Sequence, residues 1–195
     1  MEIVLVRHGE TEWSRDRKHT GRTDIPLTEI GRREAEMLRD TLAGRGFVRV
    51  LSSPLSRALE TCRLAGLGDQ AELTDDLREW DYGEYEGITT AEIREGRPDW
   101  FLWRDGCPGG ETAADVGRRT DRVIGSLGGD EGDVALFAHG HVLRVLTARW
   151  LGLGPEAGAL FKLDTGTLSA LGYERETRVI TCWNAPVIGS GTPPR

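Results

Sequence analysis

The sequence has little cysteine. Cys62, Cys107 and Cys182 are the three cysteines among 195 residues, widely spaced and without a Cys-x-x-Cys pair. An odd number of scattered cysteines argues against a disulfide framework. We therefore expect small thiols, buried or half-buried, in a protein of the cytoplasm.

Long apolar runs are also absent. The first six residues hold five apolar side chains around Glu2, and Arg7 follows at once. This run is too short for the apolar part of a signal peptide and far below the roughly 20 residues of a membrane span. We expect no contact with a membrane.

An excess of basic charge is missing. The chain has 25 Lys and Arg against 32 Asp and Glu, a formal net charge of −7. A general nucleic-acid binder would normally show a basic face, so we expect no nucleic-acid partner. A locally basic pocket is compatible with an acidic protein, so the net charge does not exclude a small phosphorylated metabolite as a partner. We leave open that two copies form a homodimer.

The length suits one domain, and a hydrophobic content of 38% is enough for a single core. We predict that this domain spans residues 1–188. The last residues, 189–195, are Gly, Ser, Thr, Pro and Arg, and we expect a disordered tail there.

Apolar runs alternate with helical patterns along the chain. We predict strands over residues 3–6, 48–52, 134–138, 168–172 and 179–183, and helices over 28–43, 53–64, 89–96, 113–127 and 141–151. Ser53 before Pro54 predicts a helix start, and Thr89 with Glu92 has the spacing of a capping box. The alternation indicates an α/β fold, with a sheet covered by helices on both faces.

Charged clusters follow three of the predicted strands. Arg7 and His8 come after the first, residues 53–57 after the second, and residues 139–141 after the strand that ends at Ala138. Functional groups in such sheets gather beyond the carboxyl ends of the strands. His8 there suits a nucleophile, with Arg7 beside it as a fork of donors for phosphate oxygens. Taken alone, the cluster is also compatible with ordinary polar residues at a strand end.

Six ordered segments together resemble the motifs of the histidine phosphatase superfamily, the phosphoglycerate mutase-like clan. They are residues 7–13, 20–31, 52–61, 79–87, 109–112 and 138–141. The resemblance runs from residue 7 to about residue 144. It implies a three-layer α/β/α sandwich with a mostly parallel central sheet, a phosphohistidine intermediate, and no metal or other cofactor.

The resemblance also assigns roles to single residues. His8 would be the nucleophile, Glu79 the general acid, and Arg7, Arg57 and His139 the phosphate pocket. Some of these residues also have interpretations that involve no catalysis. Glu79 is one acid among 32, Arg57 could pair with Glu60 on a solvated helix face, and His139 with His141 could be metal ligands without a recognisable remaining set. The role of His141 stays open, as bonded to nearby backbone or lining the pocket.

The segment after Glu79 narrows the choice within the superfamily. Trp80-Asp81-Tyr82 stands where mutases usually have Arg-His-Tyr, and Asp81 would repel a phosphoglycerate carboxylate but accept hydrogen bonds from sugar hydroxyls. With residues 103–107 and 137–144, the segment resembles fungal sedoheptulose-1,7-bisphosphatases and mycobacterial acid phosphatases. That resemblance implies a substrate site formed by Ser14, Thr20, Gly21, Trp80, Asp81, Tyr82, Gly140 and Arg144. It leaves open whether the Gly166-Thr167 turn closes this site.

We therefore predict a metal-independent phosphatase of small phosphomonoesters, namely sugar phosphates or bisphosphates. The alternative is a phosphatase for another metabolite, of the phosphoserine or alpha-ribazole phosphate type. A phosphoglycerate mutase and a silent phosphate-binding protein are weaker alternatives. The silent protein is disfavoured because both His8 and Glu79 are present.

Overall fold

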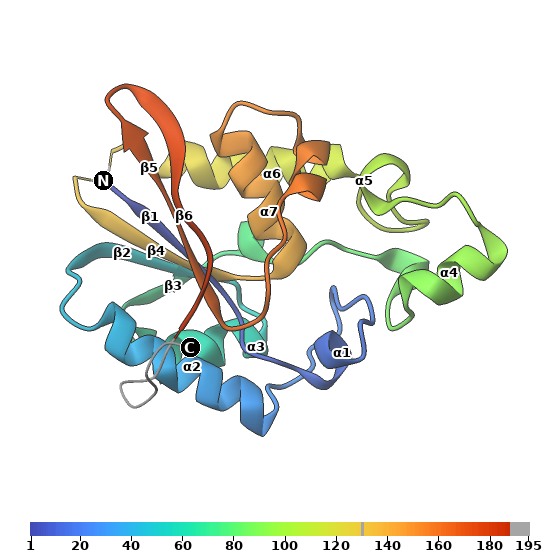
Figure 1. Ribbon diagram of the computed structural model, residues 1–195, viewed down its shortest axis with the longest axis horizontal. Coiled ribbons are helices and arrows are strands. Elements are labelled where there is room, and N and C mark those ends of the chain that lie inside the picture. The colour runs from blue at the N-terminus through green and yellow to red at the C-terminus, as the bar shows by residue number, and fades with distance from the viewer. Residues whose placement is uncertain (130, 188–195) are drawn as a thin grey trace.

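A six-stranded mixed sheet forms the centre of the molecule (Figure 1). The computed structural model describes residues 1–129 and 131–187; the predicted tail, 189–195, lies outside them. The strands are β1 (Ile3–Arg7), β2 (Phe47–Ser52), β3 (Ala71–Leu73), β4 (Asp133–Ala138), β5 (Thr167–Glu174) and β6 (Thr177–Pro186), in the spatial order β3-β2-β4-β1-β5-β6. β1, β2, β3 and β4 pair in parallel, whereas β5 and β6 are antiparallel. The prediction of a mostly parallel sheet is confirmed.

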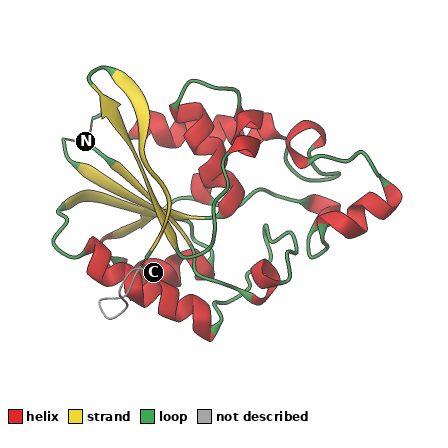
Figure 2. Ribbon diagram, in the orientation of Figure 1, coloured by secondary structure: helices red, strands yellow, loops and turns green. Residues whose placement is uncertain are grey.

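Helices cover both faces of the sheet, as Figure 2 shows. α2 (Glu29–Leu42) and α3 (Ser56–Leu64) lie on one face, and α6 (Ala113–Ser126) and α7 (Gly140–Trp150) on the other. Successive side chains of β1 point to opposite faces of the sheet, so both faces are apolar and need a cover. Val4 and Val6 belong to the core cluster under α2 and α3, whereas Ile3 and Leu5 belong to the cluster under α6 and α7. The three-layer sandwich predicted from the resemblance is therefore present.

Shorter helices lie around the carboxyl end of the sheet. They are α1 (Glu12–Arg15), α4 (Thr90–Gly96) and α5 (Leu102–Asp105). The 3₁₀ turns are η1 (Gly68–Gln70), which directly precedes β3, η2 (Asp75–Leu77), η3 (Gly83–Tyr85) and η4 (Pro155–Leu160). In Figure 1, α4 and α5 project away from the sheet. Trp100 and Trp103 are buried in the core between this extension and α7. None of the helices in the described part of the chain is long and apolar enough to cross a membrane.

Local signals predicted most helix ends well. Thr28 caps α2 by accepting from the amide of Gly31, and Thr89 with Glu92 forms the predicted capping box. The predicted start at Ser53 is wrong, since α3 begins at Ser56 with Leu55 as its N-cap. The amide of Ser53 instead donates to the carbonyl of Phe137, and its hydroxyl bonds His139. Ser53 thus extends the hydrogen bonding between β2 and β4 by one residue at the carboxyl end of the sheet, and it does not begin the helix.

Two further results concern the short strand β3 and the cysteines. The strand β3 was not predicted, because its three residues, Ala-Glu-Leu, are too few to show a period and two of them are exposed. All three cysteines are free thiols, Cys62 and Cys107 buried and Cys182 half-buried, as predicted.

The register of the sheet decides where the polar clusters meet. Arg7 pairs with Ala138, and Ser52 pairs with Phe137. The residues that follow these strand ends, His8, Ser53 and His139, therefore emerge side by side at one edge.

Candidate active site

His8 lies at the end of β1 and is buried, with 5% of its surface exposed. Its Nδ1 is 2.7 Å from the carbonyl oxygen of Gly9, which can only accept, so Nδ1 carries the proton and Nε2 keeps its lone pair. Burial, followed by the charges of Arg57 and Arg7, holds the pKa of His8 well below its usual value. The ring is therefore neutral and ready to act as a nucleophile.

Arg7 supplies positive charge at the same place. One of its terminal nitrogens, Nη1, donates to the carbonyl of Leu163 at 2.5 Å. Its Nε is buried and has no hydrogen-bond partner among residues 1–129 and 131–187. A buried, unpaired guanidinium N–H is costly unless an acceptor occupies the site, so this atom indicates a position for an anion.

Gly140, the first residue of α7, lets the helix approach Arg7. A Cβ added there would lie 3.2 Å from the guanidinium carbon.

Arg57 and His139 lie behind His8 rather than in the open cavity. Arg57 is fully buried on α3, and its Nε donates to Nδ1 of His139 at 3.1 Å. Nε2 of His139 consequently carries the proton and donates to the Ser53 hydroxyl at 2.8 Å. The remaining donors of Arg57 bind the backbone carbonyls of Thr20, Gly21 and Thr23.

The alternatives for these two residues are thereby resolved. Glu60 pairs with Arg32 and not with Arg57, so the solvated pair on α3 is absent. The rings of His8 and His139 meet edge to face, with centroids 5.1 Å apart. Both ring nitrogens of His139 are used by protein groups, and burial with the Arg57 charge holds its pKa well below the usual value.

Glu79 sits at the N-terminus of α7. Its Oε1 accepts from the amides of Trp80 and Val142 at 2.9 Å, and its Oε2 accepts from the amide of His141 at 3.0 Å. The free N–H groups of a helix N-terminus suit a carboxylate, so the helix fixes the orientation of this acid. Glu79 is 8% exposed and is not a surface carboxylate.

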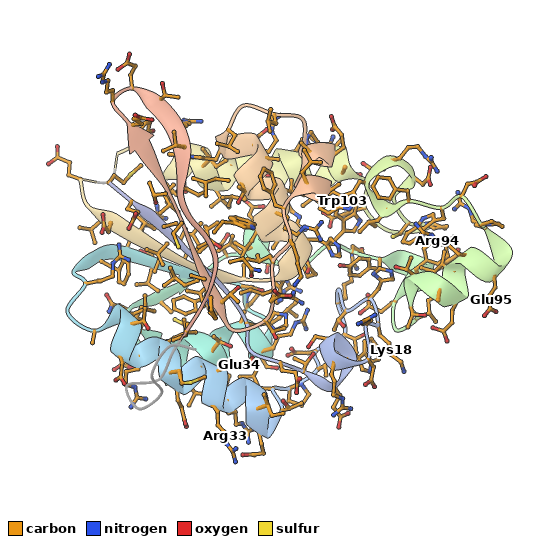
Figure 3. The ribbon with its side chains drawn as sticks, in the orientation of Figure 1. Lys18, Arg33, Glu34, Arg94, Glu95 and Trp103 are labelled. Carbon is orange, nitrogen blue, oxygen red and sulfur yellow. The ribbon has the colours of Figure 1, made fainter. Side chains whose placement is uncertain are left out.

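A cavity of about 330 Å³ opens in front of these groups. Several predicted site residues line it together with nearby groups that the sequence did not single out. The lining comprises Arg7, His8, Ser14, Arg17, Lys18, His19, Thr20, Glu79, Tyr82, Thr90, Gly140, His141, Arg144 and Leu163. Figure 3 labels Lys18, on the loop after α1, and Trp103, on α5, whose ring stacks under the guanidinium of Arg144. The cavity thus lies between α1, the extension around α4 and α5, and the start of α7.

Three predicted substrate residues do not line this cavity. Asp81 accepts from the amide of Gly83 and pairs with Arg22 at 2.6 Å, in a separate cavity of about 150 Å³ that Gly21 also lines. Trp80 is fully buried, and its indole N–H donates to the carbonyl of Glu111. The idea that Asp81 accepts from substrate hydroxyls loses its basis, because both of its oxygens already have protein partners.

The Gly166-Thr167 turn has a different role from the one considered. The amide of Gly166 donates to the carbonyl of His8 at 3.1 Å, and the turn does not line the cavity. It holds the backbone of the nucleophile from the β5 side.

His19 is the main site residue that the sequence analysis missed. It is buried, stacks on Tyr82 with centroids 4.6 Å apart, and lies within 3.3 Å of the Thr90 hydroxyl through Nε2. Burial lowers its pKa to about 4. The signal available was its rarity, since the chain has four histidines and the other three stand in motifs.

Comparison with known proteins agrees with this geometry. A family model described as histidine phosphatase superfamily (branch 1) matches residues 3–186. The chain belongs to the histidine phosphatase superfamily. As such it is a phosphoric monoester hydrolase, and the resemblance predicted from six motifs is confirmed.

Relatives of this histidine phosphatase act on different phosphate esters. An acid phosphatase of Mycobacterium tuberculosis is 41% identical over 180 residues, covering 90% of this chain and 88% of that protein. Sedoheptulose 1,7-bisphosphatase of Saccharomyces cerevisiae is 39% identical over 185 residues, covering 77% of this chain and 68% of that protein. The solved structure of a Mycobacterium tuberculosis open reading frame product superposes with a TM-score of 0.91 at 38% identity, covering 96% of this chain and 98% of that one.

Proposed function

We propose that this histidine phosphatase hydrolyses small phosphomonoesters, namely sugar phosphates or bisphosphates, through a phosphohistidine on His8 and without a metal ion. One observation carries the proposal. A neutral His8, its Nε2 lone pair free, lies beside Arg7, whose buried Nε has no partner in the described part of the chain. Both residues line the cavity of about 330 Å³, so a nucleophile and a cationic side chain meet there.

The reaction proceeds in two displacements. Nε2 of His8 attacks phosphorus, the bond from phosphorus to the ester oxygen breaks, and Glu79 gives a proton to the departing alkoxide. Water then attacks the phosphohistidine, Glu79 takes a proton from it, and inorganic phosphate leaves with His8 restored. Arg7 holds the phosphoryl oxygens, and the buried charge of Arg57 acts from behind His8. These cationic groups supply the charge that metal ions supply in other phosphatases.

The cations of the cavity support a substrate with a second anionic group. Arg17, Lys18 and Arg144 line it in addition to Arg7, whereas Glu79 is the one carboxylate among the described residues that does so. A single phosphate needs fewer positive charges than this. The excess favours a bisphosphate over a neutral alcohol ester. The sugar bisphosphate substrate named for the yeast relative fits the same expectation.

Trapping the intermediate tests the proposal. Rapid quench with a radiolabelled substrate should yield an acid-labile, base-stable phosphoprotein, and the His8→Ala variant should yield none. Equal labelling of the variant, or no labelling of the native enzyme across several substrates, would refute the role of His8.

A panel of sugar mono- and bisphosphates, phosphoglycerates and phosphoamino acids would then rank the substrates. Dialysis against EDTA should leave turnover within about twofold, because the arginines supply the charge. Loss of activity that zinc or magnesium restores would contradict metal independence.

A further inference from the structure

We infer that His141 is a substrate-contacting specificity residue, a neutral hydrogen-bond donor to an oxygen of the alcohol part of the substrate, and that Tyr82 fixes its tautomer. The inference rests on the proposed function and extends it from the phosphate to the leaving group. The Tyr82 hydroxyl and Nδ1 of His141 are 2.6 Å apart.

The proton in this contact belongs to the tyrosine. Tyr82 is 2% exposed, and within residues 1–129 and 131–187 its hydroxyl has Nδ1 of His141 as its hydrogen-bond partner. If Nδ1 donated, the phenolic hydrogen of this nearly buried side chain would have no acceptor within the described residues, at a cost of about 1–3 kcal/mol. The hydroxyl therefore donates, Nδ1 accepts, and the ring hydrogen of the neutral His141 must be on Nε2.

The surroundings keep this pair uncharged. Burial, Glu79 and Cys107 raise the pKa of Tyr82, so its hydroxyl stays protonated. Burial, followed by the charge of Arg144 and by His19, holds the pKa of His141 well below its usual value. The imidazole therefore presents a fixed N–H at neutral pH.

The position of His141 identifies the part of the substrate that it meets. Its own amide donates to Oε2 of Glu79, and its side chain, 23% exposed, lines the cavity. Glu79 has to reach the ester oxygen to protonate it, so the alcohol begins beside this residue. Gly140, the preceding residue, packs on the guanidinium of Arg7. His141 is thus the next group along α7 after the phosphate site.

This arrangement favours an alcohol that carries an oxygen near the ester bond. A hydroxylated sugar offers such an acceptor, whereas the ring of an aryl phosphate does not. His141 also replaces Asp81 as the candidate for hydroxyl recognition, since the Asp81 oxygens are held by Gly83 and Arg22 outside the cavity.

The test compares fructose 1,6-bisphosphate with p-nitrophenyl phosphate. His141→Leu should lower kcat/KM for the sugar ester about tenfold and change the aryl ester less than about threefold. His141→Gln places an amide N–H near the position of Nε2 and should recover most of the loss. Inhibition by inorganic phosphate should stay within about twofold in both variants, because the phosphate site is unchanged.

A second variant isolates the tautomer. Tyr82→Phe should allow both tautomers of His141, which nitrogen NMR of the imidazole would detect, and should lower kcat/KM for the sugar ester about threefold or more. Tyr85→Phe is the matched control. It removes a hydroxyl that binds Arg97 and does not line the cavity, and it should leave both values unchanged.

The outcomes separate this inference from the proposed function. Equal losses on both esters in His141→Leu, or no recovery with Gln, would overturn the role of His141 while the phosphatase remains. A native enzyme that hydrolyses the aryl ester but not the sugar ester would also overturn it. Hydrolysis of neither ester, with no phosphoprotein formed, would refute the proposed function itself.

Discussion

At the scale of single residues, a side chain's partners decide its role more than its place in a motif does. Glu79 and Asp81 are two residues apart, yet Glu79 is held by amides of α7 and lines the cavity in front of His8, whereas Asp81 lines the smaller cavity, which Glu79 also borders, and not the cavity of His8. We therefore expect different kinetic effects when the two carboxylates are replaced. Loss of Glu79 should depend on the leaving group of the substrate and loss of Asp81 should not, and rates on an alkyl and an aryl phosphate can distinguish the two.

Replacing Glu79 should affect substrates according to their leaving groups. Glu79→Gln keeps the shape but removes the proton that an alkoxide needs, whereas a nitrophenolate leaves without one. We expect kcat to fall about a hundredfold or more for an alkyl phosphate and about tenfold or less for p-nitrophenyl phosphate. Steady-state rates on the two esters check this, and equal losses on both would show that Glu79 is not the acid.

Asp81→Ala should instead act on stability. The change removes the acceptor of the Gly83 amide and the pair with Arg22, in a turn where Gly83 has φ of +52°. We expect the free energy of unfolding to fall by about 1 kcal/mol, with the same small change in kcat/KM for sugar and aryl esters. Arg22→Ala is the control, because its exposed side chain should contribute less than 1 kcal/mol. A selective loss on the sugar ester would return Asp81 to the substrate site.

At the scale of elements, an ion pair between the buried Arg119 and the half-buried Glu111 connects α6 to the loop that carries Glu79. Arg119 on α6 binds both carboxylate oxygens of Glu111, at 2.9 and 3.0 Å, and its terminal nitrogens donate to the carbonyls of Asp76, Arg78 and Glu79. Glu111 in turn accepts from the amide of Asp81. The planar fork of an arginine suits this set of acceptors and a lysine does not.

Arg119→Lys should therefore loosen the loop that positions Glu79. We expect a loss of about 1–3 kcal/mol in the free energy of unfolding and a fall in kcat of about tenfold for alkyl esters, with a smaller fall for aryl esters. Urea unfolding and the two-ester assay measure these effects. Arg118→Lys is the matched control on the same helix, since Arg118 is exposed and, within residues 1–129 and 131–187, pairs with Asp115 alone. An equal fall on both esters would indicate a structural role without positioning of the acid.

At the scale of the whole molecule, the four histidines make the fold sensitive to mild acid. Burial is the largest cause in each case, and it lowers the pKa of His8, His19, His139 and His141. In the unfolded chain these rings take up protons near pH 6.5, whereas in the folded protein they do not. Their contribution to stability is therefore complete above about pH 6.5 and is lost as the pH falls below it.

The histidine effect can be measured by urea unfolding between about pH 7.5 and pH 5. For His19, whose folded pKa is about 4, the loss over this range should be about 2 kcal/mol. In the His19→Gln variant, the fall in the free energy of unfolding over this pH range should be smaller by that amount. A free energy of unfolding that is flat over this range in the native protein would contradict the lowered pKa values.

The sequence by itself determined the order of five of the six strands and of the long helices, most of the predicted helix caps, the superfamily, and two residues that line the cavity, His8 and Glu79. These features depend on neighbours in the chain. Thr89 and Glu92 form a capping box within one turn. Arg7 ends β1 and His8 follows it, and the four apolar residues before them point alternately to the two faces of the sheet.

Only the tertiary structure decided which of the motif residues reach the cavity. Ser53 suits a helix cap by its neighbours, but His139 from 86 positions away takes its hydroxyl. Asp81 suits hydroxyl recognition by its chemistry, but Arg22 and Gly83 occupy its oxygens. His19 and His141 enter the cavity through packing on Tyr82, and no local pattern encodes that contact. Burial and long-range hydrogen bonds set these roles, because a polar side chain removed from water takes whichever partner the fold brings within reach.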